Sequence, residues 1–147
     1  MAADPVAERP CTCFRLRRAA RLLSRHYDHA LAPAGLNVNQ FSILRRAGEG
    51  AQPLGVLARK LGMDRTTLTR DLKPLLAQGR VALVAGADAR QRCVRLAAPG
   101  RRALQRALPL WRAAQAAIDA GVGIDAVDAL HAGIDRATGF LLARDAG

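Results

Sequence analysis

A chain of 147 residues suits one domain of ordinary size, and half of its residues are hydrophobic, enough for a real core. Aromatic residues make up only 3%, so that core must be built from Ala, Leu and Val, a composition that favours helix. The net charge of +11 points to a polyanionic partner, nucleic acid before a membrane surface. No window approaches a membrane span and no secretion signal begins the chain, so we expect a cytoplasmic protein.

Helices are predicted over most of the chain, after a loose arm at residues 1–10. The first helix runs from about Cys11 to Leu31, with an apolar stripe at steps of three or four residues and arginines on its other faces. Asp64 is a good N-cap for a later helix, which has Pro74 inside it. The further expected elements are helices near 37–47, 53–61 and 65–78, strands at 81–84 and 93–96, and helices at 99–120 and 125–143.

This order of elements predicts the fold class. Helix, turn, helix and hairpin in the middle of the chain make the winged-helix arrangement. The protein is expected to be mostly α, a winged helix-turn-helix domain with a two-strand wing. Its N- and C-terminal helices would form a dimerisation domain, because they expose more Leu and Ala than one small domain could bury. The predicted regions are a flexible arm (1–10), a dimerisation region (11–35 and 98–147) and a DNA-binding region (36–97).

The helix predicted near residues 65–78 has a leucine face and an opposite face of hydroxyls and cations. A major groove accepts such a helix and offers base edges and phosphates to it. The candidate DNA-binding residues on this helix are Arg65, Thr66, Thr67, Thr69, Arg70 and Lys73.

Arginines also gather on the predicted hairpin, where Arg90, Arg92 and Arg95 lie at or near the tip and return strand. A narrow minor groove attracts inserted arginine. From residue 45 to 106 there are 14 Lys or Arg against 4 Asp or Glu, whereas residues 118–147 carry 5 Asp and 2 Arg. The basic charge is therefore concentrated in the middle of the chain. This predicts a double-stranded DNA partner, with non-specific nucleic-acid binding as the alternative.

Several segments resemble the MarR family of regulators. The segments 57–61, 64–70 and 75–79 are similar to that family's helix-turn-helix. Asp88-Ala89-Arg90 with Leu96 and Gly100 is similar to its wing signature. The resemblance covers about residues 11–115. The chain departs from the family's usual residues at three positions. Arg80 replaces the usual Leu, Leu83 replaces a basic residue, and Ala97 replaces Thr.

The resemblance implies a homodimer whose first and last helices intertwine and whose recognition helices enter successive major grooves of a pseudo-palindromic operator. It implies that Arg90 enters the minor groove and that Asp88 orients it. It also implies a repressor that an effector, either an oxidant or a small ligand, releases from DNA.

Cys13 is the sharpest candidate for the effector site. Thr12-Cys13-Phe14 near the start of the first helix is similar to the peroxide-sensing branch of the family, and Tyr27 occupies the place of that branch's later tyrosine. Arg17 stands where the branch has another tyrosine, and its guanidinium would favour the thiolate. Oxidation of Cys13 is therefore one predicted switch.

Other switches stay open. Cys11 and Cys13 could bind a thiophilic metalloid such as arsenic or antimony, given a third ligand. An organic anion could bind near Arg15, Arg18 or His26. We expect no metal site at His26 and His29, no cofactor and no enzymatic activity, because the sequence has no nucleophile–base pair, phosphate-binding glycine loop or metal motif.

Overall fold

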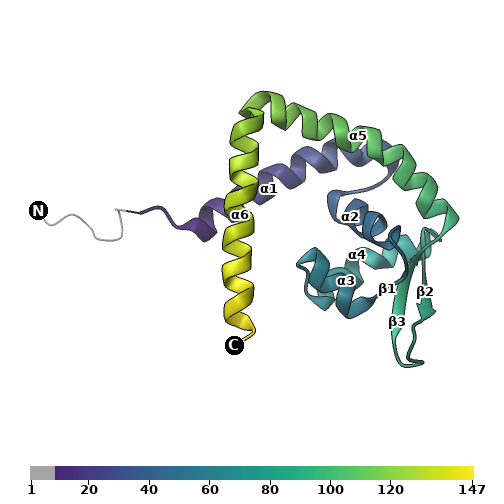
Figure 1. Ribbon diagram of the computed structural model, residues 1–147. Coiled ribbons are helices and arrows are strands. Elements are labelled where there is room, and N and C mark those ends of the chain that lie inside the picture. Colours follow the sequence, from purple (N-terminus) through teal and green to yellow (C-terminus); the bar gives the residue numbers. More distant parts are fainter. Residues whose placement is uncertain (1–8) are drawn as a thin grey trace, which may run out of the picture. The chain divides into compact units, whose positions relative to one another are not determined.

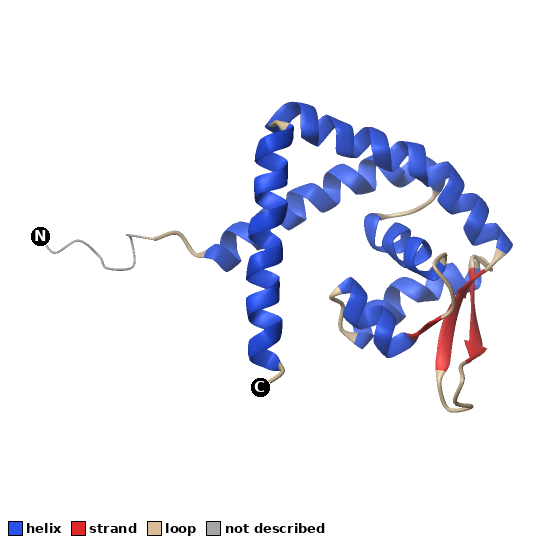
Figure 2. Cartoon of the chain, in the orientation of Figure 1, coloured by secondary structure: helices blue, strands red, loops and turns tan. Residues whose placement is uncertain are grey.

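Helices dominate residues 9–147, the part of the chain that the computed structural model describes (Figure 1, Figure 2). Most of the predicted N-terminal arm, residues 1–8, lies outside this part. The helices are α1 (Thr12–Leu31), the 3-10 helix η1 (Ala32–Ala34), α2 (Val38–Ala47), α3 (Leu54–Leu61), α4 (Arg65–Ala77), α5 (Ala98–Val122) and α6 (Ile124–Asp145). The strands are β1 (Gln52–Pro53), β2 (Val81–Ala85) and β3 (Arg92–Leu96). The predicted helices and the hairpin are confirmed, with ends shifted by a few residues.

The chain divides into two compact units, residues 1–110 and residues 111–147, and the boundary falls inside α5. The first unit holds α1 to α4, the sheet and the start of α5, and the second holds the end of α5 and all of α6. The regions predicted from the sequence were defined by role, as a dimerisation region and a DNA-binding region, and that division stays a prediction.

Local capping explains where several helices of the first unit begin or end. Asn37 and Gln40 form a capping box at the start of α2, each side chain accepting the other residue's backbone N–H. At α1, the Sγ of Cys11 accepts the N–H of Phe14 at 3.5 Å, so Cys11 precedes the helix rather than opening it. Gly62 ends α3 at φ +63°, a left-handed conformation that favours glycine.

The wing contains one strand more than the sequence predicted. Its strand order is β1-β3-β2 with antiparallel pairing, and Val94 lies opposite both Gln52 and Leu83. We expected Pro53 to open a helix. It instead ends the two-residue β1, and α3 begins at the next residue. A strand of two residues has no period-2 pattern that a sequence could reveal.

The core of the first unit forms around α2, which packs against α1, α3, α4 and β3. Its largest fully buried side chains are Leu31, Ile43, Leu44, Leu57, Leu68, Leu75 and Val94. Two hydrogen bonds fix the helices around this core. Asp28 of α1 accepts the N–H of Val38 at 2.7 Å, and Asn39 of α2 donates to Asp71 of α4 at 3.0 Å. The helix that carries the candidate DNA-binding face is therefore held by both apolar packing and polar contacts.

The start of α5 lies unusually close to the residue before β2. A Cβ on Gly100 would collide with the backbone oxygen of Arg80 and would lie 2.8 Å from a methyl group of Leu96. The backbone oxygen of Arg80 also accepts the N–H of Ala97 at 3.0 Å. The guanidinium of Arg80 donates to the backbone oxygen of Gly35 at 2.9 Å. Arg80, a departure from the MarR pattern, thus joins the α1–α2 turn to the base of the wing.

The apolar faces predicted on the long helices are only partly buried. On α1, Leu31 is the one buried residue of the predicted stripe, and Leu16 and Leu23 are exposed. On α5, Ala103 and Ala107 are fully buried. The α5 helix continues through Pro109. Among the described residues, no helix is long and apolar enough to cross a membrane.

Candidate nucleic-acid interface

The outer face of α4 is polar and basic, as predicted. Leu68, Leu72 and Leu75 point into the core, which leaves the opposite side of the helix to solvent. A shallow hollow on that side is lined by Arg65, Thr66, Thr69, Arg70 and Lys73. These five side chains are exposed and share one surface, whereas the predicted contact residue Thr67 is only half-exposed.

Asp64 fixes the N-terminal end of this surface. Its carboxylate accepts the backbone N–H of Thr67 at 2.7 Å, and the same hydrogen bond is the main reason that the pKa of Asp64 is lowered from its usual 3.8. A smaller contribution comes from the positive charge of Arg70. This hydrogen bond therefore stabilises both the ionised form of Asp64 and the first turn of α4.

We expect Asp64→Ala to lower the melting temperature at neutral pH. A carboxylate with a lowered pKa stabilises the fold above its unfolded pKa, and this contribution is lost as the pH falls through the folded value. The difference in melting temperature between wild type and variant should therefore shrink below about pH 3.8. Asp64→Ser, which keeps a capping oxygen, should show a smaller loss at pH 7. Equal melting temperatures for wild type and Asp64→Ala at pH 7 would contradict the capping role.

The wing tip is a loop at residues 86–91 that its own hydrogen bonds hold in place. Asp88 accepts the backbone N–H of Arg90 on its side chain at 3.0 Å and that of Gln91 on its backbone oxygen at 2.9 Å. The Asp88 carboxylate thus positions Arg90 through its backbone. The role implied by the resemblance, orienting the Arg90 side chain, stays a prediction.

The wing and the helix-turn-helix share a second, arginine-lined hollow of about 330 Å³. It brings Arg90 and Arg92 of the wing together with Arg65 of α4 and Arg59 of α3. Residues 53–56, around the start of α3, and Gln91 complete its lining. Arginine side chains and the free N–H groups of a helix start both suit a phosphate. The geometry therefore unites three of the predicted residues and adds Arg59.

Arg59 was not among the predicted DNA-binding residues, because the sequence around it does not distinguish it from Lys60. The two basic residues are adjacent on a short amphipathic helix, and the sequence pattern does not indicate which of them faces outward. In the structure, the Nζ of Lys60 donates to Oε1 of the buried Gln52 at 3.0 Å, so Lys60 anchors β1.

The cysteines lie in two separate settings. Cys11 and Cys13 are exposed at the start of α1, and Cys93 is buried in the central strand of the wing sheet. Within residues 9–147, no group of three or more His, Cys, Asp or Glu side chains could hold a metal ion. The third ligand that the metalloid hypothesis requires therefore has no candidate in this part of the chain.

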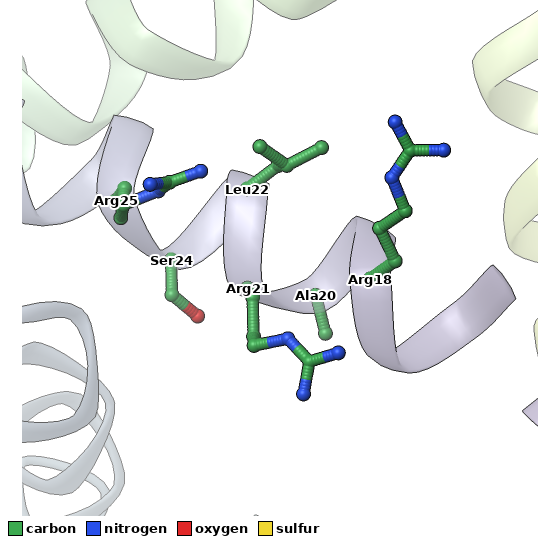
Figure 3. A pocket seen from close by; sticks show the side chains of 6 residues that line it. All are labelled: Arg18, Ala20, Arg21, Leu22, Ser24 and Arg25. Carbon is green, nitrogen blue, oxygen red and sulfur yellow. The ribbon is translucent and has the colours of Figure 1, made fainter. Parts of the chain in front are cut away.

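The remaining effector candidates all lie on α1. Tyr27 lies on the same helix as Cys13, and fourteen residues of helix separate them by roughly 21 Å, so they cannot meet within one chain. Its ring packs edge-on against His26, at 5.5 Å between centroids. Arg17 is exposed. Arg18 lines an open hollow with Ala20, Arg21, Leu22, Ser24 and Arg25 (Figure 3).

Comparison with solved structures decides the family. Over 90% of its length the chain is similar to the crystal structure of the transcriptional regulator MosR of M. tuberculosis in complex with DNA. The two are 43% identical, the match covers 98% of that chain, and the TM-score is 0.77. The chain belongs to the MarR family. The predicted winged-helix fold and role as a DNA-binding transcriptional regulator are thereby confirmed.

More distant structures share the fold of this MarR-family chain. The repressor CouR bound to a 23-mer DNA duplex is 24% identical, with a TM-score of 0.78 and coverage of 87% of this chain and 92% of that one. MarR from E. coli is 20% identical, with a TM-score of 0.71 and coverage of 88% and 98%. No family model and no curated protein matches the sequence.

Proposed function

We propose that this protein represses transcription by binding a pseudo-palindromic operator as a homodimer, and that an effector acting on α1 releases it. The observation that carries the proposal is the exposed surface of α4, where Arg65, Thr66, Thr69, Arg70 and Lys73 surround one hollow without an acidic side chain among them. Such a surface offers donors to base edges and phosphates of a major groove. MosR and CouR were crystallised with DNA, which supports this role.

The two hollows divide the work of DNA binding. Thr66, Thr69 and Arg70 are assigned to base edges, because they lie along the exposed face of α4 in its first half. Arg65, Arg59 and Arg92 surround the hollow between α4, α3 and the wing, where one phosphate group would meet several guanidiniums. Lys73 extends the α4 surface toward the backbone of the duplex, and Arg90 at the wing tip is assigned to the minor groove.

Dimerisation would cover apolar side chains that are exposed in the single chain. On α1 these are Phe14, Leu16, Leu22 and Leu23, and on α6 they are Ile124, Leu130, Ile134, Phe140, Leu141 and Leu142. A set of this size on two long helices exceeds what a monomeric protein normally leaves in water. A dimer also matches the two-fold symmetry of a pseudo-palindrome, with half-sites about 10 bp apart.

Hydroxyl-radical footprinting on DNA from upstream of the protein's own gene tests this proposal. A dimer on successive major grooves should protect two patches whose centres are about one helical turn apart. Uniform protection along the fragment would indicate non-specific coating and would contradict the proposal.

Removing Arg90, the arginine at the wing tip, should weaken DNA binding without changing the preferred DNA sequence. We expect Arg90→Ala to reduce affinity about 5- to 10-fold on operator and scrambled duplex alike, and to reduce the slope of log K against log salt by about 1. Arg136→Ala removes the same charge from α6 and should change neither quantity. Unchanged affinity for Arg90→Ala would remove the wing tip from the interface.

We propose oxidation of Cys13 as the releasing event. A peroxide would transfer one oxygen to the exposed sulfur of Cys13, which gives a sulfenic acid, and its other oxygen would leave as water. Cys11, two residues away, would be available to condense with the sulfenic acid to a disulfide, with loss of a second water. The oxidised group would lie at the start of α1, beside the exposed Phe14 of the proposed dimer surface. An organic anion held by Arg15, Arg18 or His26 is the second candidate effector.

A serine variant separates these two effectors. We expect the operator affinity of wild type to fall at least about tenfold after peroxide treatment and to recover with a thiol reductant. Cys13→Ser should bind operator normally and resist peroxide, and Cys93→Ser serves as a control because Cys93 is buried. If Cys13→Ser is released as readily as wild type, the switch is not this thiol.

The proposed role needs no catalytic step, and the solved structures compared above are those of regulators. We therefore propose that the protein is not an enzyme and that it works in the cytoplasm, where bacterial operators lie.

A further inference from the structure

Arg80 lies between α4 and the wing strand β2, and it makes hydrogen bonds in three directions. Its backbone N–H donates to the oxygen of Leu75 at 2.9 Å, which closes the C-terminal end of α4. Its backbone oxygen accepts the N–H of Ala97 at 3.0 Å, next to the end of β3. Its guanidinium donates to the backbone oxygen of Gly35 at 2.9 Å. One residue therefore connects α4, the base of the wing and the turn between α1 and α2.

The contact between Arg80 and Gly35 is a close one. Gly35 follows η1 with φ +69°, a left-handed conformation that favours glycine. A Cβ on Gly35 would lie 3.1 Å from a guanidinium nitrogen of Arg80. Leucine, which is usual at the position of Arg80 in the MarR family, has no donor for the Gly35 oxygen. The hydrogen bond is therefore a feature of this chain and not a requirement of the fold.

The turn that accepts the Arg80 guanidinium is itself held by hydrogen bonds. Asp28 of α1 accepts the N–H of Val38 at 2.7 Å across this turn. Within the turn, the N–H of Gly35 donates to the oxygen of Ala32 at 2.9 Å. Because both bonds close the same turn, the Gly35 oxygen is a well-placed acceptor for Arg80.

A second hydrogen bond joins the same region to α4. Asn39, in the first turn of α2, donates from its Nδ2 to the carboxylate of Asp71 at 3.0 Å, and both residues are half-buried. Asp71 directly follows Arg70 of the α4 surface, whereas Arg80 lies beyond the end of the helix. Helix α4 is therefore attached near its middle to the start of α2, and beyond its end to the turn before α2. Two attachments resist rotation of the helix about either one of them.

We propose that Arg80 is a positioning residue for DNA recognition. Together with the hydrogen bond between Asn39 and Asp71, its guanidinium holds the α4 surface and the wing in the arrangement that fits the duplex, without touching DNA itself. The inference rests on the assignment of α4 and the wing to DNA, and it adds the residues that hold them in place. Contacts to base edges require accurately placed donors, whereas long basic side chains can follow a phosphate. Loss of either attachment should therefore reduce affinity for operator more than affinity for other DNA.

Two variants remove the two attachments separately. Arg80→Leu removes the guanidinium, and Asn39→Ala removes the donor to Asp71 without a change of charge. In fluorescence anisotropy, each should lower operator affinity about fivefold, the effect of one lost hydrogen bond, and change affinity for a scrambled duplex by less than about twofold. The slope of log K against log salt should stay the same for both variants, because no phosphate contact is lost.

Arg101→Leu and Arg80→Lys are the matched controls. Arg101 is exposed and follows Gly100, which contacts the Arg80 backbone, so Arg101→Leu removes the same charge nearby and should leave the preference for operator unchanged. Arg80→Lys keeps the charge and a donor, and it should recover most of the lost operator affinity. Urea denaturation shows whether each variant is folded in the assay, and Asn39→Ala tests the proposal by itself if Arg80→Leu is not.

The outcomes separate a positioning role from a direct contact. Equal losses of affinity on both duplexes for Arg80→Leu, with a salt slope reduced by about 1, would make Arg80 a phosphate contact and overturn the inference. An unchanged ratio of operator affinity to scrambled affinity in either folded variant would overturn it as well. A wild type with no preference for operator would contradict the proposed DNA recognition, and the inference would fall with it.

Discussion

Gly100→Ala is expected to lower the free energy of unfolding by about 2–3 kcal/mol, the cost of forcing an extra carbon into a closely packed site. The added methyl group would collide with the backbone oxygen of Arg80 and crowd a methyl group of Leu96. The oxygen cannot simply move, because it also accepts the Ala97 N–H at 3.0 Å. Urea denaturation of purified protein measures the loss.

Gly55→Ala is the matched control for this experiment. Gly55 lies in the same compact unit, and a Cβ there would meet nothing within 4 Å. Its unfolding free energy should stay the same or rise slightly, because alanine favours helix over glycine. Equal stability of Gly100→Ala and wild type would show that α5 and the base of the wing are not packed as described.

Arg70→Ala should reduce operator affinity about 10- to 100-fold, equivalent to roughly 1–3 kcal/mol for a bidentate contact with a base. Arg70 is exposed in the middle of the α4 surface, between Thr66 and Lys73. Because a base contact carries sequence information, the loss of affinity for a scrambled duplex should be smaller. The ratio of the affinity for operator to the affinity for the scrambled duplex should therefore fall. Fluorescence anisotropy on the two duplexes measures both effects.

Lys73→Ala provides the contrast within α4. We assign Lys73 to the DNA backbone, so its removal should weaken binding to both duplexes by a similar factor. Equal losses on operator and scrambled DNA for Arg70→Ala would reassign Arg70 to the backbone as well.

The sequence predicted the helices and the hairpin well because their signals are local. Asp64 before α4 and Gly62 after α3 mark helix ends through hydrogen bonding and a positive φ, which depend on a few neighbouring residues. The leucine spacing in α4 also predicted its buried face, and so its outer face of Arg65, Thr66, Thr69, Arg70 and Lys73.

Features that depend on residues distant in sequence were harder to predict. Strand β1 exists only because Gln52 and Pro53 pair with β3, some forty residues later. Arg59 joins the candidate site only because α3 folds beside the wing. The contact between Gly100 and Arg80 is likewise visible only in three dimensions. The apolar stripe predicted on α1 is buried only at Leu31, and the dimer that would cover the rest of it is a proposal.

The central claim is that the α4 surface and the wing recognise a specific DNA sequence. The most direct test is fluorescence anisotropy of the reduced protein at about 150 mM salt, on the duplex from upstream of its own gene and on a scrambled duplex of equal length. A specific regulator should prefer the first by about 1,000-fold or more, roughly 4 kcal/mol. Equal affinity for the two duplexes would mean that the net charge of +11 only attracts nucleic acid, and would contradict the account.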